Sequence, residues 1–195
     1  MKHLKILGLA LVAAAALMAF LGAGTASATK LCEDKACTVD YAKGTKIVST
    51  LSGSAILETT GGTVLDTCTG GEVNGKTSET EGEPLSGSIS ALTWSGCSKT
   101  TDTTATGELK IKATSGGNGE VEGVGSSVTV SGIFGTSCVY GTGTGTKLGE
   151  LQGGTPATLA ISALVPRTVA NALCPAETRW TASYTVTSPT SLFVG

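Results

Sequence analysis

The sequence predicts an all-β protein: an antiparallel β-sandwich of the Greek-key, immunoglobulin-like type, with a β-barrel as the alternative architecture. From Lys46 onward, short apolar runs alternate with clusters of Gly, Ser, Thr and Asn, which is typical of strands separated by turns. Two of these runs alternate apolar and polar residues at every second position. About ten such segments follow one another, a number that fits either architecture.

The first alternating segment is Glu108–Ala113. Leu109 and Ile111 occupy every second position, and charged residues occupy the positions between them. Successive side chains of a strand point to opposite faces, so this pattern predicts one apolar face and one face in water. The segment therefore belongs in an antiparallel sheet.

The second alternating segment covers residues 180–187. Its hydroxyl-bearing residues share one face, and the apolar side chains on the other face are Trp180, Ala182, Tyr184 and Val186. Further strands are expected at Ile47–Leu51, Ala55–Thr59, Val64–Cys68, Ser88–Trp94, Val121–Val124, Ser127–Ile133, Cys138–Tyr140 and Ala157–Val165.

Turn residues separate these segments. Asn118-Gly119 is expected to be a hairpin turn, because Asn and Gly tolerate positive φ, and Asn74-Gly75 is expected to be another turn. Thr158–Val165 is almost continuously apolar, which predicts a central strand buried on both faces, or else a helix, ended by Pro166. Two segments are expected to be exposed loops: the acidic Thr77–Pro84 and the Gly/Thr-rich Thr142–Thr146.

Residues 1–28 have the pattern of a signal peptide: a basic start, an apolar middle and the small residues Ala26-Ser27-Ala28. We expect cleavage after Ala28, followed by a disulfide-pinned segment, 29–45, and a single β domain, 46–195. A retained membrane anchor is the alternative, because residues 6–28 are just long enough to cross a bilayer. A lipid anchor would need small residues directly before Cys32, where Thr29-Lys30-Leu31 stand instead.

The expected mature chain is weakly acidic. Two of the 13 basic residues and none of the 15 acidic ones lie in the signal peptide, which leaves a net charge of −4. Such a chain offers no basic patch for phosphates, so neither nucleic acid nor anionic lipid is an expected partner. After signal cleavage no integral membrane association is expected. The low aromatic content, 4% of the chain, means that Val, Ile, Leu and Ala must fill the core.

The six cysteines all follow the signal peptide, and an even set in an exported chain predicts disulfides. Many pairings are formally possible, and we favour pairing in chain order: Cys32 with Cys37, Cys68 with Cys97, and Cys138 with Cys174. A zinc site is the alternative reading of the cysteines. The spacings are too wide for it, and the single histidine, His3, lies in the signal peptide, so neither a metal nor another cofactor is expected.

Catalysis is not expected. Without a mature histidine or a free thiolate, the usual nucleophile–base pairs cannot form. Paired carboxylates, as in glycosidases, remain, and candidates on or beside the expected strands are Glu58, Asp66, Glu72 and Glu120. Nothing in the sequence brings two of them together.

Four aromatic residues are candidates for contact with a ligand: Trp94, Tyr140, Trp180 and Tyr184. Each is also suited to packing in the core or against a disulfide. The arginines, Arg167 and Arg179, could orient an anionic group, but pairing with a surface carboxylate is the simpler expectation.

Several short segments resemble uncharacterised secreted Gly/Thr-rich proteins of actinobacteria. They are Leu31-Cys32 to Cys37, Thr67-Cys68-Thr69-Gly70, Trp94-Ser95-Gly96-Cys97 and Cys174-Pro175 to Trp180. The resemblance implies export and β structure, and it implies no activity. In its Gly, Thr, Ala and Val content the chain is also similar to the neocarzinostatin-like apoproteins, which are secreted immunoglobulin-like sandwiches.

The expected function is that of a secreted, non-catalytic protein that acts as a structural or adhesive module at the cell envelope or cell wall, with glycan contact. The first alternative is an extracellular binding protein for a small ligand or carbohydrate. The second is a protease inhibitor acting through the loop Gly141–Leu148.

Overall fold

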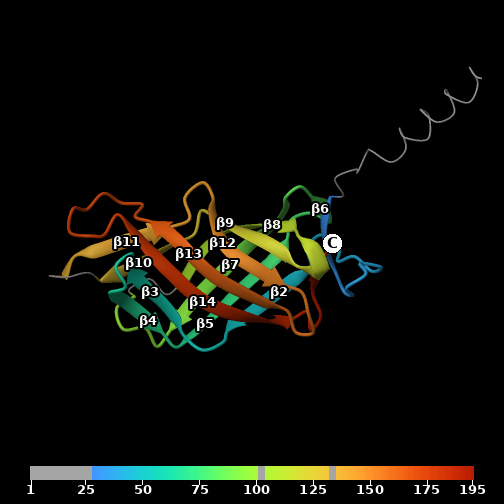
Figure 1. Ribbon diagram of the computed structural model, residues 1–195, viewed down its shortest axis with the longest axis horizontal. Helices are drawn as coiled ribbons and strands as arrows, with labels where there is room; N and C mark the ends of the chain where they lie inside the picture. Colours follow the sequence, from blue (N-terminus) through green and yellow to red (C-terminus); the bar gives the residue numbers. More distant parts are fainter. Residues whose placement is uncertain (1–27, 101–103, 132–134) are drawn as a thin grey trace, which may run out of the picture.

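Strand β14 (Glu177–Ser188) closes the sheet of this protein into an antiparallel barrel (Figure 1). The structure is a computed structural model that describes residues 28–100, 104–131 and 135–195. The expected signal peptide therefore lies, except for Ala28, outside the described residues. So do residues 132 and 133 of the expected strand Ser127–Ile133.

The barrel and its extensions consist of short antiparallel strands joined mostly by tight turns. The strands of the first half are β1 (Thr29–Cys32), β2 (Lys46–Leu51), β3 (Ala55–Thr59), β4 (Val64–Cys68), β5 (Gly70–Thr77), β6 (Glu81–Gly82), β7 (Leu85–Ser95) and β8 (Thr104–Ala113). A 3₁₀ turn, η1 (Ser115–Gly117), follows. The strands of the second half are β9 (Gly119–Val124), β10 (Ser127–Ser131), β11 (Ser137–Gly141), β12 (Thr146–Gln152), β13 (Thr158–Pro166), β14 and β15 (Phe193–Val194).

Both edges of β14 are paired, and this closes the ring. One edge of β14 pairs with all nine residues of β13, and the other edge pairs with β2 and β3. The ring order among the described strands is β13-β12-β9-β8-β7-β5-β2-β14 and back to β13. The all-β antiparallel prediction is thus confirmed. Of the two predicted architectures the structure has the barrel and not the sandwich, because β14 pairs both with β13 and with β2.

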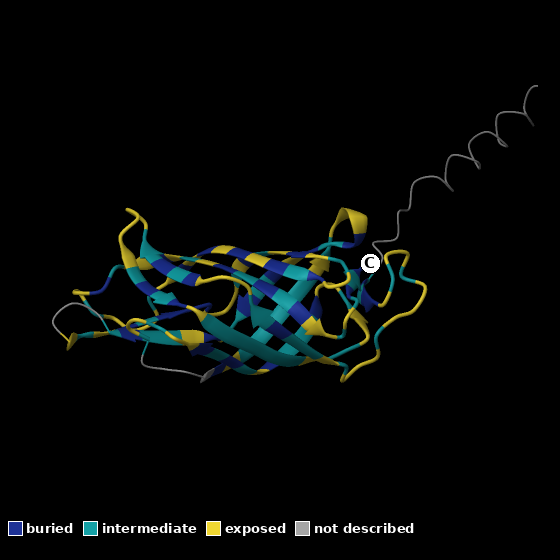
Figure 2. Cartoon of the chain, turned by 90° about the horizontal axis from the view of Figure 1, so that it is seen from below, coloured by how far each residue is buried: buried dark blue, intermediate teal, exposed yellow. Residues whose placement is uncertain are grey.

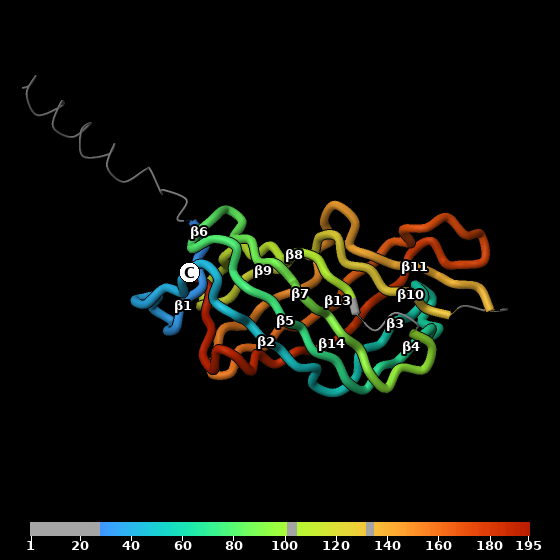
Figure 3. Tube along the Cα trace, turned by 180° about the vertical axis from the view of Figure 1, so that it is seen from behind, coloured from blue at the N-terminus to red at the C-terminus, as the bar shows by residue number. Residues whose placement is uncertain are grey.

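Short breaks in otherwise continuous strands lengthen the barrel at one end. β2 and β3 lie in line along β14, and residues 52–54 separate them. In the same way β9 continues as β10, and β11 continues as β12. β3, β4, β10 and β11 therefore gather at one end of the molecule, whereas β1, β6 and the C-terminus lie at the other (Figure 3).

Alternation of side chains builds a continuous apolar interior. Buried and exposed residues alternate along the strands of the barrel wall (Figure 2). The face assignments predicted for β8 and β14 are confirmed, since Ala182, Tyr184 and Val186 are buried and Leu109 and Ile111 pack against the core. The prediction for Thr158–Val165 is half wrong. The segment is strand β13, but only its inner face is buried, because the outer face of a closed barrel is in water and Leu164 is 44% exposed there.

Two turn predictions have opposite outcomes. Asn118 lies in the connection between β8 and β9, as predicted. Asn74-Gly75 is not a turn: it lies inside β5, at an irregularity in the pairing with β7. Gly75 is needed there because a Cβ at this position would lie 2.7 Å from the carbonyl oxygen of Ser88.

The two segments predicted to be exposed loops are only partly so. Glu81–Gly82 forms β6 and pairs with β1. Thr142 is buried, and its hydroxyl oxygen accepts a 3.0 Å hydrogen bond from the amide of Ser126. Only residues 143–145 of the second segment form an exposed turn.

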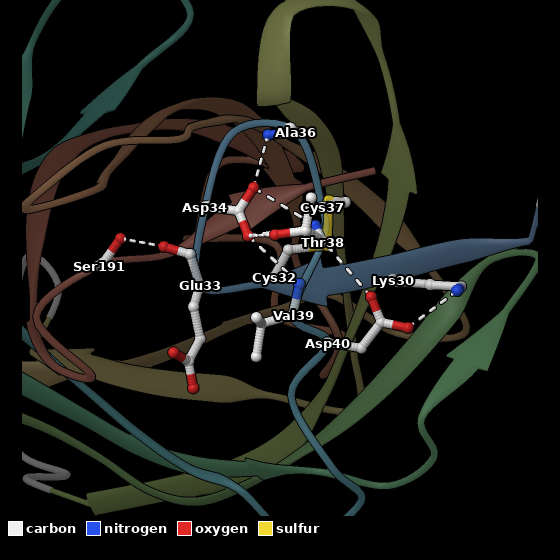
Figure 4. Close-up of a disulfide and its surroundings, with 10 residues drawn as sticks. All are labelled: Lys30, Cys32, Glu33, Asp34, Ala36, Cys37, Thr38, Val39, Asp40 and Ser191. Atoms are coloured by element: carbon white, nitrogen blue, oxygen red, sulfur yellow. Dashed lines mark hydrogen bonds and ion pairs between the residues drawn. A yellow bond between two sulfur atoms is a disulfide. The ribbon is translucent and has the colours of Figure 1, made fainter.

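The N-terminal segment closes one end of the barrel. β1 pairs with β15 on one side and β6 on the other, and Leu31 is buried among the interior side chains. The Cys32–Cys37 disulfide ties the following loop, and the carboxylate of Asp34 accepts hydrogen bonds from the amides of Ala36, Thr38 and Val39 (Figure 4). These bonds, together with that from the Thr38 hydroxyl, hold the pKa of Asp34 below its ordinary value.

The other two disulfides lie at the opposite end, and all three pairs are those favoured from the sequence. Cys68–Cys97 joins β4 to the segment after β7, and Cys138–Cys174 joins β11 to the loop before β14. Among the described residues no cysteine is free. No helix in the described ranges has the length and hydropathy needed to cross a membrane.

Candidate functional site

Three of the four aromatic residues singled out from the sequence meet in one cavity at the extended end of the barrel. This aromatic cavity has a volume of about 60 Å³, and Trp94 of β7, Tyr140 of β11 and Trp180 of β14 line it. Tyr140 is fully buried and Trp94 is 9% exposed, whereas Trp180 is only partly buried. The inward alternation of each strand explains why side chains so far apart in the sequence converge.

Tyr184, the fourth candidate, lies one level deeper along the barrel. It lines a second, smaller space of about 30 Å³, the middle cavity, together with Trp180, Leu109 and Ile161. Because Trp180 and Tyr184 are four residues apart on β14, they face the same interior at successive levels. Leu92, Ser126, Thr142 and Trp180 line both the aromatic and the middle cavity, so the two spaces adjoin.

A third space, the aliphatic cavity, lies toward the end closed by β1. Its volume is about 80 Å³, and its wall is formed mostly by Leu, Ile and Val side chains such as Leu31, Leu85 and Val121. It shares Val73, Ile89, Leu109 and Leu159 with the middle cavity. The interior is thus a series of three adjoining spaces, aromatic at one end and aliphatic at the other.

Three buried hydroxyl groups in this interior have no hydrogen-bond partner among the described residues: Ser126 Oγ, Tyr140 OH and Tyr184 OH. Ser126 and Tyr140 line the aromatic cavity, and Ser126 and Tyr184 line the middle one. A buried hydroxyl without a partner costs roughly 1–3 kcal/mol. Three such groups around adjoining cavities are a feature that packing alone does not require.

Both tyrosines are uncharged at neutral pH. Burial raises the pKa of Tyr184 to about 12, and the nearby Trp94 indole N–H acts in the opposite direction although it lies outside hydrogen-bond geometry with this hydroxyl. Burial also raises the pKa of Tyr140, and the charge of Arg167 offsets part of that rise. Each tyrosine therefore presents a neutral hydroxyl that can donate or accept a hydrogen bond.

A glycine makes room for the Ser126 hydroxyl. A Cβ on Gly107 of β8 would lie 2.2 Å from Ser126 Oγ and 2.7 Å from the carbonyl oxygen of Val124. Gly71 of β5 has a different role: a Cβ there would be in ordinary contact with the Tyr184 hydroxyl, at 3.6 Å, but would clash with the carbonyl oxygen of Thr93, at 2.9 Å. The Ser126 hydroxyl therefore occupies space that a side chain at position 107 would fill.

Asp66 forms part of the wall of the aromatic cavity, and both of its carboxylate oxygens accept hydrogen bonds from the protein. Its Oδ1 accepts hydrogen bonds from the Ser98 hydroxyl (2.6 Å) and from the amides of Thr67 (2.8 Å), Ser98 (2.9 Å) and Lys99 (2.8 Å). Its Oδ2 accepts one from the Thr100 hydroxyl. Burial alone would raise the pKa of Asp66, but these bonds outweigh it and hold the pKa below the ordinary value.

Asp66 lies beside the disulfide Cys68–Cys97, and the three side chains together have the residue types of a metal site. Both sulfur atoms are bonded to each other, so neither is a thiolate ligand. Both oxygens of Asp66 accept hydrogen bonds from the protein. The disulfide and the hydrogen bonds of Asp66 attach the segment after β7 to β4.

The other carboxylates considered for catalysis lie in separate surroundings. Glu58 is 3.7 Å from Arg179 in an ion pair, and Glu120 is 2.6 Å from Lys147. Glu72 accepts a hydrogen bond from the side chain of Asn74. Each of these three groups has its own partner on the barrel wall.

The two arginines have different roles. Arg179 pairs with a carboxylate at the surface, as expected. The expectation is wrong for Arg167: its guanidinium donates to the carbonyl oxygens of Asn171 and Cys174. The Arg167 guanidinium thus holds together, by hydrogen bonds, the loop that the Cys138–Cys174 disulfide connects to β11.

Ser126 was not identifiable as a site residue from the sequence, because a serine in a Gly- and Ser-rich stretch carries no pattern. Asp66 was considered there as a carboxylate for catalysis, and in the structure its oxygens accept hydrogen bonds that join β4 to the segment after β7. The signal that was available is that Asp66 and Cys68 share one face of a short strand, which places a carboxylate beside a disulfide on the inward side.

No protein-family model matches this chain, and neither a curated protein nor a solved structure does. The chemistry of the cavity residues is therefore the basis for a functional assignment.

Proposed function

We propose that this protein binds a small, mainly apolar molecule inside its barrel and performs no chemistry on it. The observation that carries the proposal is the aromatic cavity, where Trp94, Tyr140 and Trp180 surround a space with buried hydroxyls that have no partner among the described residues. An apolar wall with a few convergent polar groups is the usual composition of a small-molecule site.

The sizes of the cavities support a ligand that occupies more than one of them. The aromatic cavity alone, at about 60 Å³, is smaller than the roughly 150 Å³ space that holds benzene in a protein core. A few water molecules would fit it and would hydrogen-bond to Ser126 Oγ and Tyr140 OH, but they would gain little from the apolar remainder of the wall. A ligand that extends along the barrel would use the adjoining spaces as well.

We further propose that the protein acts outside the plasma membrane. Three disulfides support this location, because they persist in oxidising compartments. The expected signal peptide at residues 1–28 agrees with it. A binding protein in this location would collect or carry a molecule present in the medium or the cell wall.

Native mass spectrometry of the protein secreted by its own host tests the proposal. We expect a bound mass that disappears after extraction with organic solvent. The recombinant protein should also change its tryptophan fluorescence when 1-octanol is added, because both tryptophans line the aromatic cavity. An unliganded spectrum together with unchanged fluorescence would contradict the proposal.

A pair of matched variants locates the site. Leu92→Phe enlarges a buried side chain that lines both the aromatic and the middle cavity, and it should weaken binding at least tenfold. Leu164→Phe makes the same change on the outer face of β13 and should leave binding unchanged. Equal effects of the two substitutions would argue against the interior as the binding site.

The structural or adhesive role in the cell envelope, including glycan contact, stays a prediction. Cell fractionation tests it, and a protein found only free in the medium would count against it. Protease inhibition through Gly141–Leu148 also stays a prediction. Only residues 143–145 and 147 of that segment are exposed, and inhibition assays on a panel of serine proteases would decide the matter.

A further inference from the structure

We infer that the ligand is an uncharged, single-chain molecule with an oxygen-bearing group at one end, which lies in the aromatic cavity, and a hydrocarbon tail directed toward the aliphatic cavity. This inference rests on the proposed function and specifies its ligand class. Alcohols, aldehydes and ketones with one alkyl chain have this chemistry.

The described residues around the three cavities offer no partner for a charged group. Among the described residues that line the three cavities, the charged ones are Asp66 and Lys76. Asp66 already accepts hydrogen bonds on both oxygens, and the Lys76 side chain is exposed. A carboxylate or ammonium group would therefore be buried without a counter-ion, which is far more costly than burying a hydroxyl.

The hydroxyl groups fix the position of the polar end. Tyr140 OH and Ser126 Oγ both line the aromatic cavity, both are at least nine-tenths buried, and neither has a partner in the described part of the chain. Each can donate to a ligand oxygen or accept from a ligand hydroxyl. Tyr184, at the middle cavity, offers a third hydroxyl further along the same axis.

The wall of the interior fixes the direction of the tail. From the middle cavity onward the shared lining residues are Val73, Ile89, Leu109 and Leu159, and they lead into the aliphatic cavity. None of the unpartnered hydroxyls lines that last space. Three narrow spaces in series accommodate one extended chain better than a bulky ring system.

Three probes of equal chain length test the ligand class: 1-octanol, octanoate and octylammonium at pH 7.5, with tryptophan fluorescence as the readout. We expect 1-octanol to bind at least thirtyfold more tightly than either ion. Shortening the alcohol to 1-hexanol should weaken binding about fourfold per methylene group removed. Octanoate binding as tightly as 1-octanol would overturn the inference and leave the proposed function standing. If no probe binds and the native protein carries no ligand, the proposed function fails, and the inference fails with it.

Two variants test the role of the hydroxyls. Tyr140→Phe and Ser126→Ala should each weaken 1-octanol binding about fivefold or more, and neither should lower the melting temperature of the ligand-free protein, because each removes a hydroxyl that has no partner in the part of the chain that the structure describes. Tyr41→Phe is the matched control. Its hydroxyl donates a 2.7 Å hydrogen bond to the Ser191 carbonyl oxygen, so this variant should lower the melting temperature and leave binding unchanged. Unchanged binding together with a lowered melting temperature in Tyr140→Phe and Ser126→Ala would overturn the assignment of the polar end.

Discussion

The hydroxyl of Ser98 donates a 2.6 Å hydrogen bond to Oδ1 of Asp66. This bond and its neighbours attach the segment after Cys97 to β4, and from there Lys99 accepts a backbone hydrogen bond from Ser131 of β10. The wall of the aromatic cavity is thus continuous from β4 to β10 through a segment that is not itself a strand. One buried carboxylate holds that segment in place.

Asp66→Asn should destabilise the protein by about 2 kcal/mol. The neutral amide has one acceptor oxygen, so it cannot satisfy all the donors that converge on the carboxylate. Urea unfolding measures the change. Glu120→Gln is the control, because it removes a more exposed ion pair with Lys147 and should cost no more than about 0.5 kcal/mol. Equal effects of the two substitutions would contradict the role given to Asp66.

The free energy of unfolding should decrease as the pH is lowered, and part of that decrease should come from Asp66. Because the pKa of Asp66 is lower in the folded state than in the unfolded state, its contribution is complete above about pH 4 and is lost as the pH falls through the folded pKa. The free energy of unfolding, measured between about pH 2 and 6, should therefore have a shallower acid slope in Asp66→Asn. Identical slopes in both proteins would show that another carboxyl group is responsible.

The three disulfides should contribute unequally. Cys68–Cys97 and Cys138–Cys174 span 29 and 36 residues, and on the chain-entropy model each contributes roughly 3.5–4 kcal/mol. Cys32–Cys37 spans 5 residues, and its contribution is about 2 kcal/mol. Paired Cys→Ser substitutions, followed by urea unfolding, should reproduce this order. A larger loss from the pair at positions 32 and 37 would contradict it.

Gly107→Ala should destabilise the barrel by roughly 1–3 kcal/mol. The added methyl group would lie 2.7 Å from the carbonyl oxygen of Val124, so the backbone must move. Gly61→Ala is the control, since its methyl group would have one neighbour, Thr59 Oγ1, at 3.8 Å. Thermal unfolding distinguishes the two variants. If Gly107→Ala left the stability unchanged, β8 and β9 could separate without cost.

Local pattern predicts much of this fold. The alternation in residues 108–113 and 180–187 identifies two strands and their inward faces correctly, because side-chain direction depends on neighbouring residues alone. Barrel closure depends on a different kind of fact. Whether β14 pairs with β2 is decided by strand length, twist and register across the whole chain, and no local segment encodes it.

The same distinction separates the predicted part of the site from the missed part. Trp94, Tyr140 and Trp180 were identifiable as rare, large side chains in an aromatic-poor chain. Their meeting in one cavity follows from the ring order of strands distant in the sequence. The strands β5 and β12 were missed because Gly70–Thr77 and Thr146–Gln152 are rich in Gly and polar residues, which is typical of turns.

The pairing of β1 with β15 has a practical consequence for measurement. Lys30 and Gly195 exchange backbone hydrogen bonds of 2.7 and 3.1 Å at the end of the barrel opposite to β3, β4, β10 and β11 (Figure 1). An affinity tag fused after Gly195 would therefore attach the protein to a sensor chip by the far end. The end that holds the aromatic cavity would point into the flowing sample, and the linker would not shield it.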